Sequence, residues 1–149
     1  MYYNPSINII ANNTIKYTAT KKLTEAKIET YYDDTIYDYN TRYTNGARLS
    51  EFNANVISHE FKNGEGVIVF DSDIYEIPYN AFYECNELTS IELPESVTNV
   101  SFNYMHSINE IICHGAFLPS ISDWECQFTG GIIKVRPNSI DGYFGLNGE

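Results

Sequence analysis

Hydrophobic residues between positions 77 and 100 recur at short, unequal intervals that neither an α-helix nor a simple strand produces. The segment reads IPYNAFYECNELTSIELPESVTNV, and its apolar positions are Ile77, Phe82, Cys85, Leu88, Ile91, Leu93, Val97 and Val100. A helix repeats its apolar positions every three or four residues, and a half-buried strand repeats them every second residue. The mixed spacing instead predicts one coil of chain, made of a strand, a turn and a short irregular or helical return.

Short runs of strand type fill much of the remaining chain, and turn-forming residues separate them. They are SINII, TIKYTAT, ANVISHEF, GVIVF, SIELP, NEIICH and GIIKV, and most are bounded by Asn, Asp, Gly or Pro. In FKNGEGVIVF, the pair Asn63-Gly64 supplies the positive-φ positions of a type I′ turn and predicts a tight hairpin. Residues 138–149 predict one short helix, so the expected class is mostly β or α+β.

An internal repeat connects the strand-like runs of the second half. Pairs of apolar residues two positions apart begin at Ile68, Ile91, Ile111 and Ile133, in steps of 23, 20 and 22 residues. Such periods indicate stacked coils that bury their strands in a common core. We therefore predict a β-rich subdomain over 1–51 and a short solenoid over 52–149, with the four isoleucines side by side. Leu93 then points inward and Glu92 outward, so Glu92→Lys is expected to change stability little.

Residues 77–100 resemble the repeat of the BspA-like bacterial leucine-rich repeats, which has the form I-x-x-x-A-F-x-x-C-x-x-L-x-x-I-x-L-P-x-x-V-x-x-I. The next unit, VSFNYMHSINEIICHG, is shorter and lacks the Ala-Phe pair and the cysteine, and IIKVRPNSIDGYF is similar to the C-terminal cap of such arrays. FNANVISHEFKNGEGVIVFDSDIYEI and NTIKYTAT are similar to the lead-in and the N-terminal hairpin seen with these repeats in proteins of gut Bacteroidetes and their phages. The resemblance implies a short, degenerate, capped leucine-rich-repeat solenoid that serves adhesion or recognition, at a bacterial cell surface or on a phage particle.

The charge of the chain narrows the expected partners. Net charge is −11 and the sequence pI is about 4.5, whereas nucleic-acid surfaces need a cationic stripe and anionic lipids attract basic segments. No apolar run is long enough to cross a bilayer, and MYYNPSINII lacks the features of a secretory signal. The chain is thus not exported by that route, or its signal lies outside it. The expected partner is a protein or a cell-surface glycan, or a neighbour in a larger assembly, and not nucleic acid or a membrane interior.

Tyrosine is the unusual feature of the composition, with 13 residues. Segment 29–45 alternates Tyr with polar residues, which is typical either of a solvent-facing strand pair or of a mobile loop. Exposed Tyr side chains bury well against a partner protein or the flat face of a sugar. The first set of candidate contact residues is therefore Tyr31, Tyr32, Tyr37, Tyr39 and Tyr43. The second set comprises the outward positions predicted on the solenoid strands, which are Val69, Glu92, Ile112 and Lys134.

Candidate chemistry is sparse in the sequence. The residues with zinc-binding side chains lack zinc-site spacing; they are His59, His106, His114, Cys85, Cys113 and Cys126. Cys85 and Cys113 occupy predicted core positions, and Cys126 is either buried under the cap or an exposed thiol. FDSDIYE resembles the start of a calcium loop without its later Gly and Glu. We predict a non-enzymatic interaction or structural module without metal or cofactor; the alternatives are a small hydrolase or lyase with a site in the N-terminal half, and a spacer without a ligand.

Overall fold

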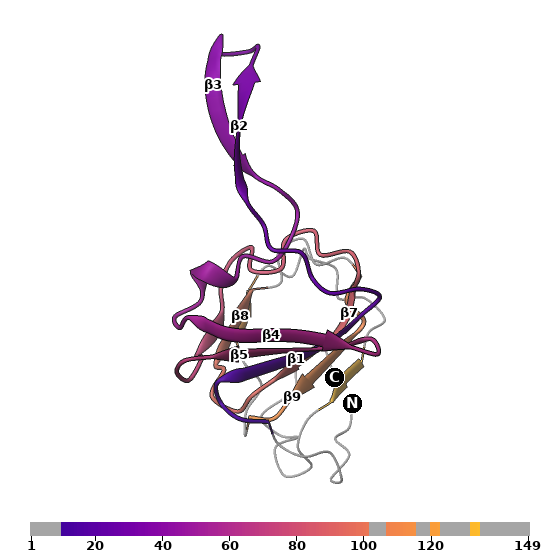
Figure 1. Cartoon of the computed structure of the whole chain (residues 1–149). Coiled ribbons are helices and arrows are strands. Elements are labelled where there is room, and N and C mark those ends of the chain that lie inside the picture. Colours follow the sequence, from indigo (N-terminus) through magenta and orange to yellow (C-terminus); the bar gives the residue numbers. More distant parts are fainter. Residues whose placement is uncertain (1–9, 102–106, 116–119, 123–131, 135–149) are drawn as a thin grey trace.

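The computed structural model describes residues 10–101, 107–115, 120–122 and 132–134, and about half of these residues lie in strands (Figure 1). The predicted mostly-β class is confirmed. The predicted C-terminal helix, most of the cap, His106 and Cys126 lie outside the described residues. The elements in chain order are β1 (Thr14–Ala19), β2 (Ile28–Asp33), β3 (Asp38–Tyr43), the 3-10 turn η1 (Leu49–Glu51), β4 (Val56–Lys62), β5 (Glu65–Phe70), β6 (Glu76–Ile77), β7 (Leu88–Leu93), β8 (Asn99–Ser101), β9 (Glu110–Cys113), β10 (Ser120–Ser122) and β11 (Ile132–Lys134).

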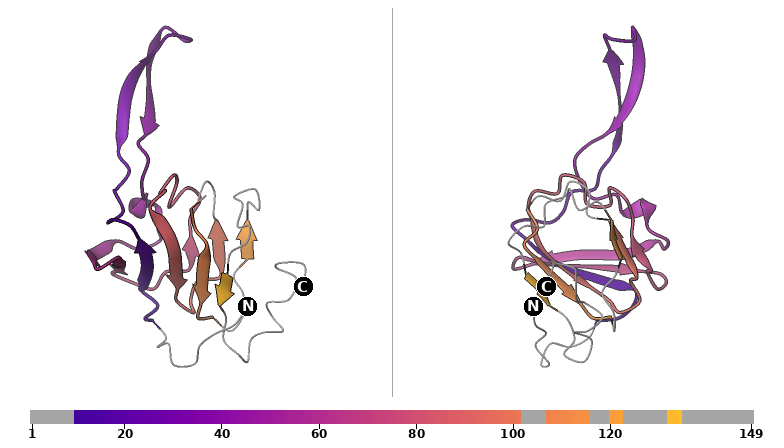
Figure 2. Two further views of the ribbon diagram at one scale, coloured as in Figure 1. Left: turned by 90° about the vertical axis from the view of Figure 1, so that its right-hand side faces the viewer. Right: turned by 180° about the vertical axis from the view of Figure 1, so that it is seen from behind.

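Two sheets enclose the core, and a two-stranded hairpin stands away from them (Figures 1 and 2). The larger sheet has the order β11-β9-β7-β1-β5-β4, the smaller sheet has the order β10-β8-β6, and the hairpin is β2-β3. From β5 onward the chain alternates between the larger and the smaller sheet. Each return to a sheet therefore places a new strand next to an earlier one.

Two ladders of aligned residues run across the parallel strands. In the larger sheet Ile91 lies opposite Ile111, and Ile111 lies opposite Ile133. In the smaller sheet Val100 lies opposite both Ile77 and Ile121. The spacing of the apolar residues thus predicted the order of β7, β9 and β11 in the larger sheet, whereas the ladder of the smaller sheet was not predicted.

Strand β1 interrupts the first ladder and corrects the prediction that Ile68 lies beside Ile91. β1 pairs antiparallel with β5 on one side and with β7 on the other, so that Ile15 faces Ile68 and Tyr17 faces Ile91. NTIKYTAT accordingly forms one central strand and not a hairpin of its own. Because Ile15, Tyr17 and Ala19 alternate with polar residues, β1 adds a buried face to the sheet and hydrogen-bonds at both edges. The predicted boundary at residues 51 and 52 therefore does not divide the core, which β1 shares with β5 and β7.

The core between the sheets contains the apolar positions that the sequence assigned to it. Phe82, Cys85 and Leu88 are almost fully buried, and successive turns carry the chain past them from Pro78 to Leu88. Burial raises the pKa of the Cys85 and Cys113 thiols to about 12. Both cysteines therefore stay protonated at neutral pH and pack as small apolar side chains.

The predicted tight turn at Asn63-Gly64 is confirmed. Strands β4 and β5 pair antiparallel up to Lys62 and Glu65. The two residues between them have φ angles of 52° and 85°, the left-handed values that a type I′ turn requires. This hairpin forms the outer edge of the larger sheet.

Candidate functional site

The β2–β3 hairpin projects from the body of the molecule into solvent, as both views in Figure 2 show. Its strands pair antiparallel from Ile28 opposite Tyr43 to Asp33 opposite Asp38, so segment 29–45 contains a strand pair and not a loop. The Asp33 carboxylate accepts hydrogen bonds from the backbone N–H and the hydroxyl of Thr35, at 2.8 and 2.5 Å. These bonds lower the pKa of Asp33 and fix the turn, in which Tyr37 has a φ of 55°.

The register of the hairpin sorts its side chains onto two faces of different character. Directly opposed residues of an antiparallel pair lie on the same face, and successive residues alternate between faces. One face, which we call the aromatic face, is uncharged and consists of Ile28, Thr30, Tyr32, Tyr39, Thr41 and Tyr43. The opposite, charged face consists of Glu29, Tyr31, Asp33, Asp38, Asn40 and Arg42.

Tyr31 differs from the other predicted tyrosines because it packs against side chains of the charged face. The Arg42 Nε atom lies 2.5 Å from Glu29 Oε1, and the guanidinium sits 4.6 Å from the centroid of the Tyr31 ring. Glu29 and Tyr31 thus hold the Arg42 side chain against the hairpin. Tyr31 is half-buried and belongs to this internal packing.

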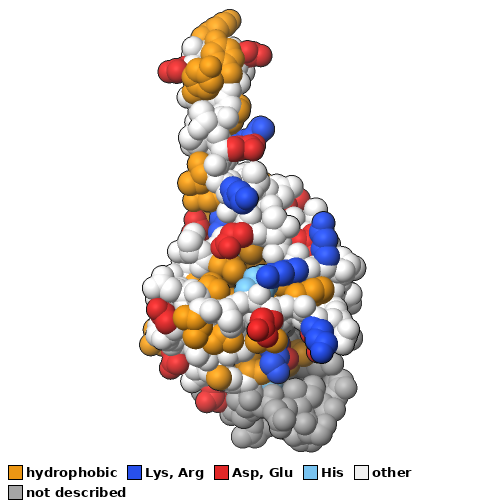
Figure 3. All heavy atoms as spheres, viewed as in Figure 1, with side chains coloured by type: hydrophobic (Ala, Val, Ile, Leu, Met, Phe, Trp, Pro, Cys, Tyr) orange, Lys and Arg blue, Asp and Glu red, His pale blue; other side chains and the backbone are white. Residues whose placement is uncertain are grey.

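Most of the aromatic face is open to solvent, and the Arg48 guanidinium covers part of Tyr43 at the end nearest the body. Tyr32 and Tyr39 meet edge to face with their centroids 5.5 Å apart, and 68% of the Tyr39 surface is exposed. Tyr37, at the turn, is 82% exposed. Figure 3 shows apolar side chains gathered at the far end of the hairpin. Ile28 and Ile36 are also exposed; sequence reasoning missed both, although Ile28 has the same parity as Tyr32 along the strand.

Hydrogen bonds and a stacked arginine attach the hairpin to the body at its neck, residues 24–27 and 44–48. Backbone N–H groups of Gly46 and Arg48 donate to the carbonyls of Tyr83 and Ala81, at 3.2 and 2.7 Å. The Arg48 guanidinium lies 3.8 Å from the ring centroid of Tyr43 on the hairpin and 5.5 Å from that of Tyr83 on the body. A side chain at Gly46 would meet the Thr24 carbonyl oxygen at 2.5 Å. The neck therefore holds the hairpin in one orientation.

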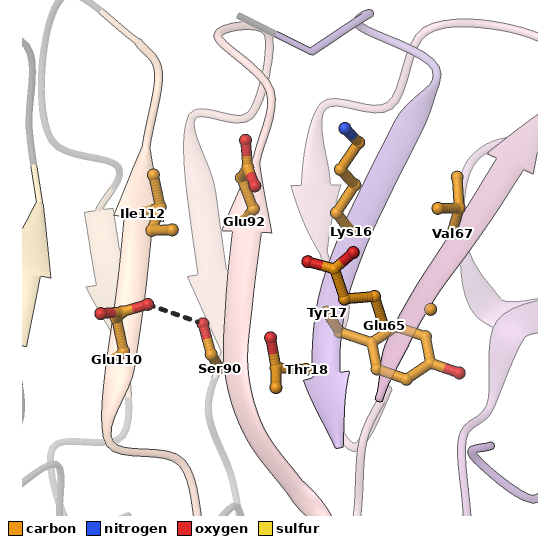
Figure 4. Close-up of a pocket in the computed structure, with 10 residues that line it drawn as sticks. Lys16, Tyr17, Thr18, Glu65, Val67, Ser90, Glu92, Glu110 and Ile112 are labelled. Atoms are coloured by element: carbon orange, nitrogen blue, oxygen red, sulfur yellow. Dashed lines mark hydrogen bonds between the residues drawn. The ribbon is translucent and has the colours of Figure 1, made fainter. Parts of the chain in front are cut away.

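Two residues of the second predicted set, Glu92 and Ile112, line a pocket of about 270 Å³ on the larger sheet, over β5, β1, β7 and β9 (Figure 4). Glu92 faces Ile112 across the strands, and Lys134 is the next residue in that row. Val69 lies apart from the row, because β1 places Lys16 beside Glu92 and Thr14 beside Val69. The structure thus brings together three of the four predicted residues, and Ile112 forms a buried part of the lining.

Comparisons with family models, curated proteins and solved structures find no match to this chain. The resemblance to leucine-rich repeats therefore stays an expectation, and function has to be argued from the geometry of the described residues.

Glu92 makes a contact that overturns the expectation of a silent Glu92→Lys change. Its Oε2 atom lies 2.6 Å from Nε2 of His114, whose side chain is completely buried. We expect Glu92→Lys to lower the free energy of unfolding by about 2 kcal/mol, because the buried His114 ring loses its hydrogen bond to the Glu92 carboxylate and meets a positive charge instead. Urea denaturation measures the difference. Glu65→Lys, at an exposed position lining the same pocket, is the matched control; equal stabilities of the two variants would contradict the assigned role.

A second polar pair ties β1 to β4. The Tyr17 hydroxyl lies 2.7 Å from His59 Nε2 and accepts a hydrogen bond from the Leu23 N–H at 3.3 Å. Desolvation is the main cause that raises the pKa of Tyr17 and lowers that of His59, so both groups are neutral at neutral pH. This pair holds strands together, and its contacts assign it no further role.

The acidic FDSDIYE segment forms a turn. The Asp71 carboxylate accepts hydrogen bonds from the backbone and side-chain nitrogens of Asn55, at 2.9 and 3.2 Å, and these bonds lower its pKa. In the part of the chain that the structure describes, no group of three His, Cys, Asp or Glu residues is arranged to hold a metal ion. No helix among the described residues has the length and apolar character to cross a bilayer.

Proposed function

We propose that this protein is a non-enzymatic interaction module, built as a short solenoid of the leucine-rich-repeat type that carries the β2–β3 hairpin as a contact arm. The two in-register ladders through Ile91 and Val100 support the solenoid, since each pass of the chain adds one parallel strand to each sheet. The repeat spacing and the resemblance of residues 77–100 support the same architecture.

One observation carries the functional proposal: an uncharged, tyrosine-rich face lies exposed on a hairpin that projects away from the described part of the body. Exposed apolar patches that polar residues surround mark interaction sites. Tyr side chains are also frequent where single residues contribute strongly to binding. The aromatic face is thus the expected contact surface, and a protein or a cell-surface glycan is the expected partner class.

The setting of this interaction is part of the proposal. A net charge of −11 disfavours anionic polymers and lipid surfaces as partners. Adhesion at a bacterial surface, or recognition on a phage particle, fits a rigid body that presents one projecting arm. A hydrolase or lyase with a site in the N-terminal half is the alternative to this proposal.

Attachment assays test the contact surface. Fluorescently labelled protein is titrated onto intact cells and onto virus particles from its native source, and the double variant Tyr32→Ser/Tyr39→Ser is compared with the unchanged chain. We expect the variant to bind at least about tenfold more weakly, because it removes two exposed aromatic contacts.

The control for this assay is Tyr79→Ser, which removes a tyrosine that is 58% exposed on the body of the molecule. Circular dichroism and thermal unfolding establish that all three proteins are folded. Unchanged attachment of the double variant, or an equal loss with the control, would overturn the assignment of the aromatic face.

A further inference from the structure

We infer that the aromatic face of the hairpin is covered in solution by the same face of a second copy of this chain, with the two hairpins antiparallel. The inference rests on the proposed function, because it names a partner for the surface that the proposal assigns to binding. Three observations carry it: the exposed area, the order of side chains along the face, and the distribution of charge from tip to neck.

The hairpin exposes enough apolar area for a specific pair. Two-stranded ribbons are marginally stable in water unless a further layer covers one face. Four apolar side chains on the aromatic face are each at least 38% exposed, which are Ile28, Tyr32, Tyr39 and Tyr43, and the turn adds Ile36 and Tyr37. At roughly 100 Å² each, the four on the face offer about 800 Å² for two copies. The total reaches about 1,200 Å², the lower end of specific interfaces, when the turn of each copy also contacts the neck of the other.

The aromatic face fits a second copy of itself in the opposite orientation. Its cross-strand pairs, here called rungs, have large side chains at both ends and small ones in the middle: Ile28 with Tyr43, Thr30 with Thr41, and Tyr32 with Tyr39. A two-fold axis through the middle rung places the Ile28 rung of one copy on the Tyr32 rung of the other. Such an isologous contact uses the same patch twice and closes after two subunits, and all the charged side chains of the strands stay on the outer faces.

Charge along the hairpin favours this antiparallel order over a parallel one. The tip carries Asp33, Asp34 and Asp38, whereas the neck carries two basic residues, Lys27 and Arg48, and one acidic residue, Glu25. An antiparallel pair brings each acidic tip to the other copy's basic neck, whereas a parallel pair stacks tip on tip. Repulsion between the two acidic bodies is screened beyond about 8 Å at physiological ionic strength, so the nearby tip-to-neck contacts decide the order.

A charge-exchange experiment tests the arrangement. Asp34 and Lys27 have exposed side chains at opposite ends of the hairpin. Sedimentation velocity is run on the unchanged chain, on Asp34→Lys, on Lys27→Glu, and on an equimolar mixture of the two variants. We expect a dimer for the unchanged chain, at least about tenfold weaker association for each variant alone, and restored association in the mixture, where every tip meets a neck of opposite charge.

Variants on the two faces of β3 provide a matched pair. Tyr39→Lys on the aromatic face is expected to leave only monomer, whereas Asn40→Lys on the charged face is expected to dimerise like the unchanged chain. A monomeric unchanged chain at all accessible concentrations would overturn the inference, as would equal association of these two variants. A dimer whose association the charge exchange does not alter would overturn the antiparallel order.

Failure of this inference is distinguishable from failure of the proposed function. If the unchanged chain is monomeric and Tyr32→Ser/Tyr39→Ser still loses attachment to cells or particles, the aromatic face binds a different partner and only the second copy is refuted. If the chain is monomeric and attachment is unaffected as well, both proposals are wrong.

Discussion

Leu93→Asp is expected to prevent folding. Leu93 is 1% exposed, lies opposite Cys113 in the larger sheet, and belongs to the core between the two sheets. A carboxylate there would be buried without a partner, which costs several kcal/mol. That cost is comparable with the entire stability of a typical domain, about 5–15 kcal/mol. Far-ultraviolet circular dichroism and urea titration measure the outcome.

The control for this substitution introduces the same carboxylate at an exposed site. Asn99 lies on β8 with its side chain exposed, so Asn99→Asp is expected to change stability by less than about 0.5 kcal/mol. A folded Leu93→Asp protein with a cooperative transition close to that of the control would contradict the position of Leu93 in the core.

Gly66→Ala is expected to lower the free energy of unfolding by about 3 kcal/mol or more, because no room exists for a methyl group beside Tyr17. A Cβ atom on Gly66 would lie 1.9 Å from Cζ of the Tyr17 ring. The ring cannot move aside cheaply: its hydroxyl contacts His59 at 2.7 Å, and it stacks on Phe61 with a centroid distance of 6.1 Å. Overpacking of this kind forces shifts of side chain or backbone.

A double-mutant cycle shows whether Tyr17 causes the cost. In a Tyr17→Leu background the methyl group of Gly66→Ala meets a smaller neighbour, so the added destabilisation is expected to fall by more than half. Urea denaturation of the four proteins gives the coupling. Additive effects, with the same cost of Gly66→Ala in both backgrounds, would mean that something other than the tyrosine ring resists the change.

The spacing of apolar residues along the chain predicted much of the fold, but it did not predict where β1 lies in the larger sheet. The 20- and 22-residue steps predicted that Ile91, Ile111 and Ile133 align, because chain segments of equal length return to equal places. The alternation in TIKYTAT predicted a strand with one buried face. The alternation does not show which strands lie beside this one, because an amphipathic strand can pair with any sheet edge whose register matches.

The sequence indicated which segment carries the candidate site, but not which side chains of that segment share a face. Alternating tyrosines in 29–45 indicated contact residues, but their division between faces depends on which residues of β2 and β3 oppose each other. That register depends on the four-residue turn that Asp33 stabilises. Glu92 was assigned to the outer face from its parity, yet a buried histidine lies on the same side, and only the folded chain shows it.

The position of β1 has a consequence for biosynthesis. Strand β1 is made before both strands that flank it, which follow about 50 to 75 residues later, and pairing over such separations slows folding. An array of like units can assemble progressively from one end. Here β1 stays unpaired on one side until the chain has been made through β7, so the middle of the larger sheet cannot form before then.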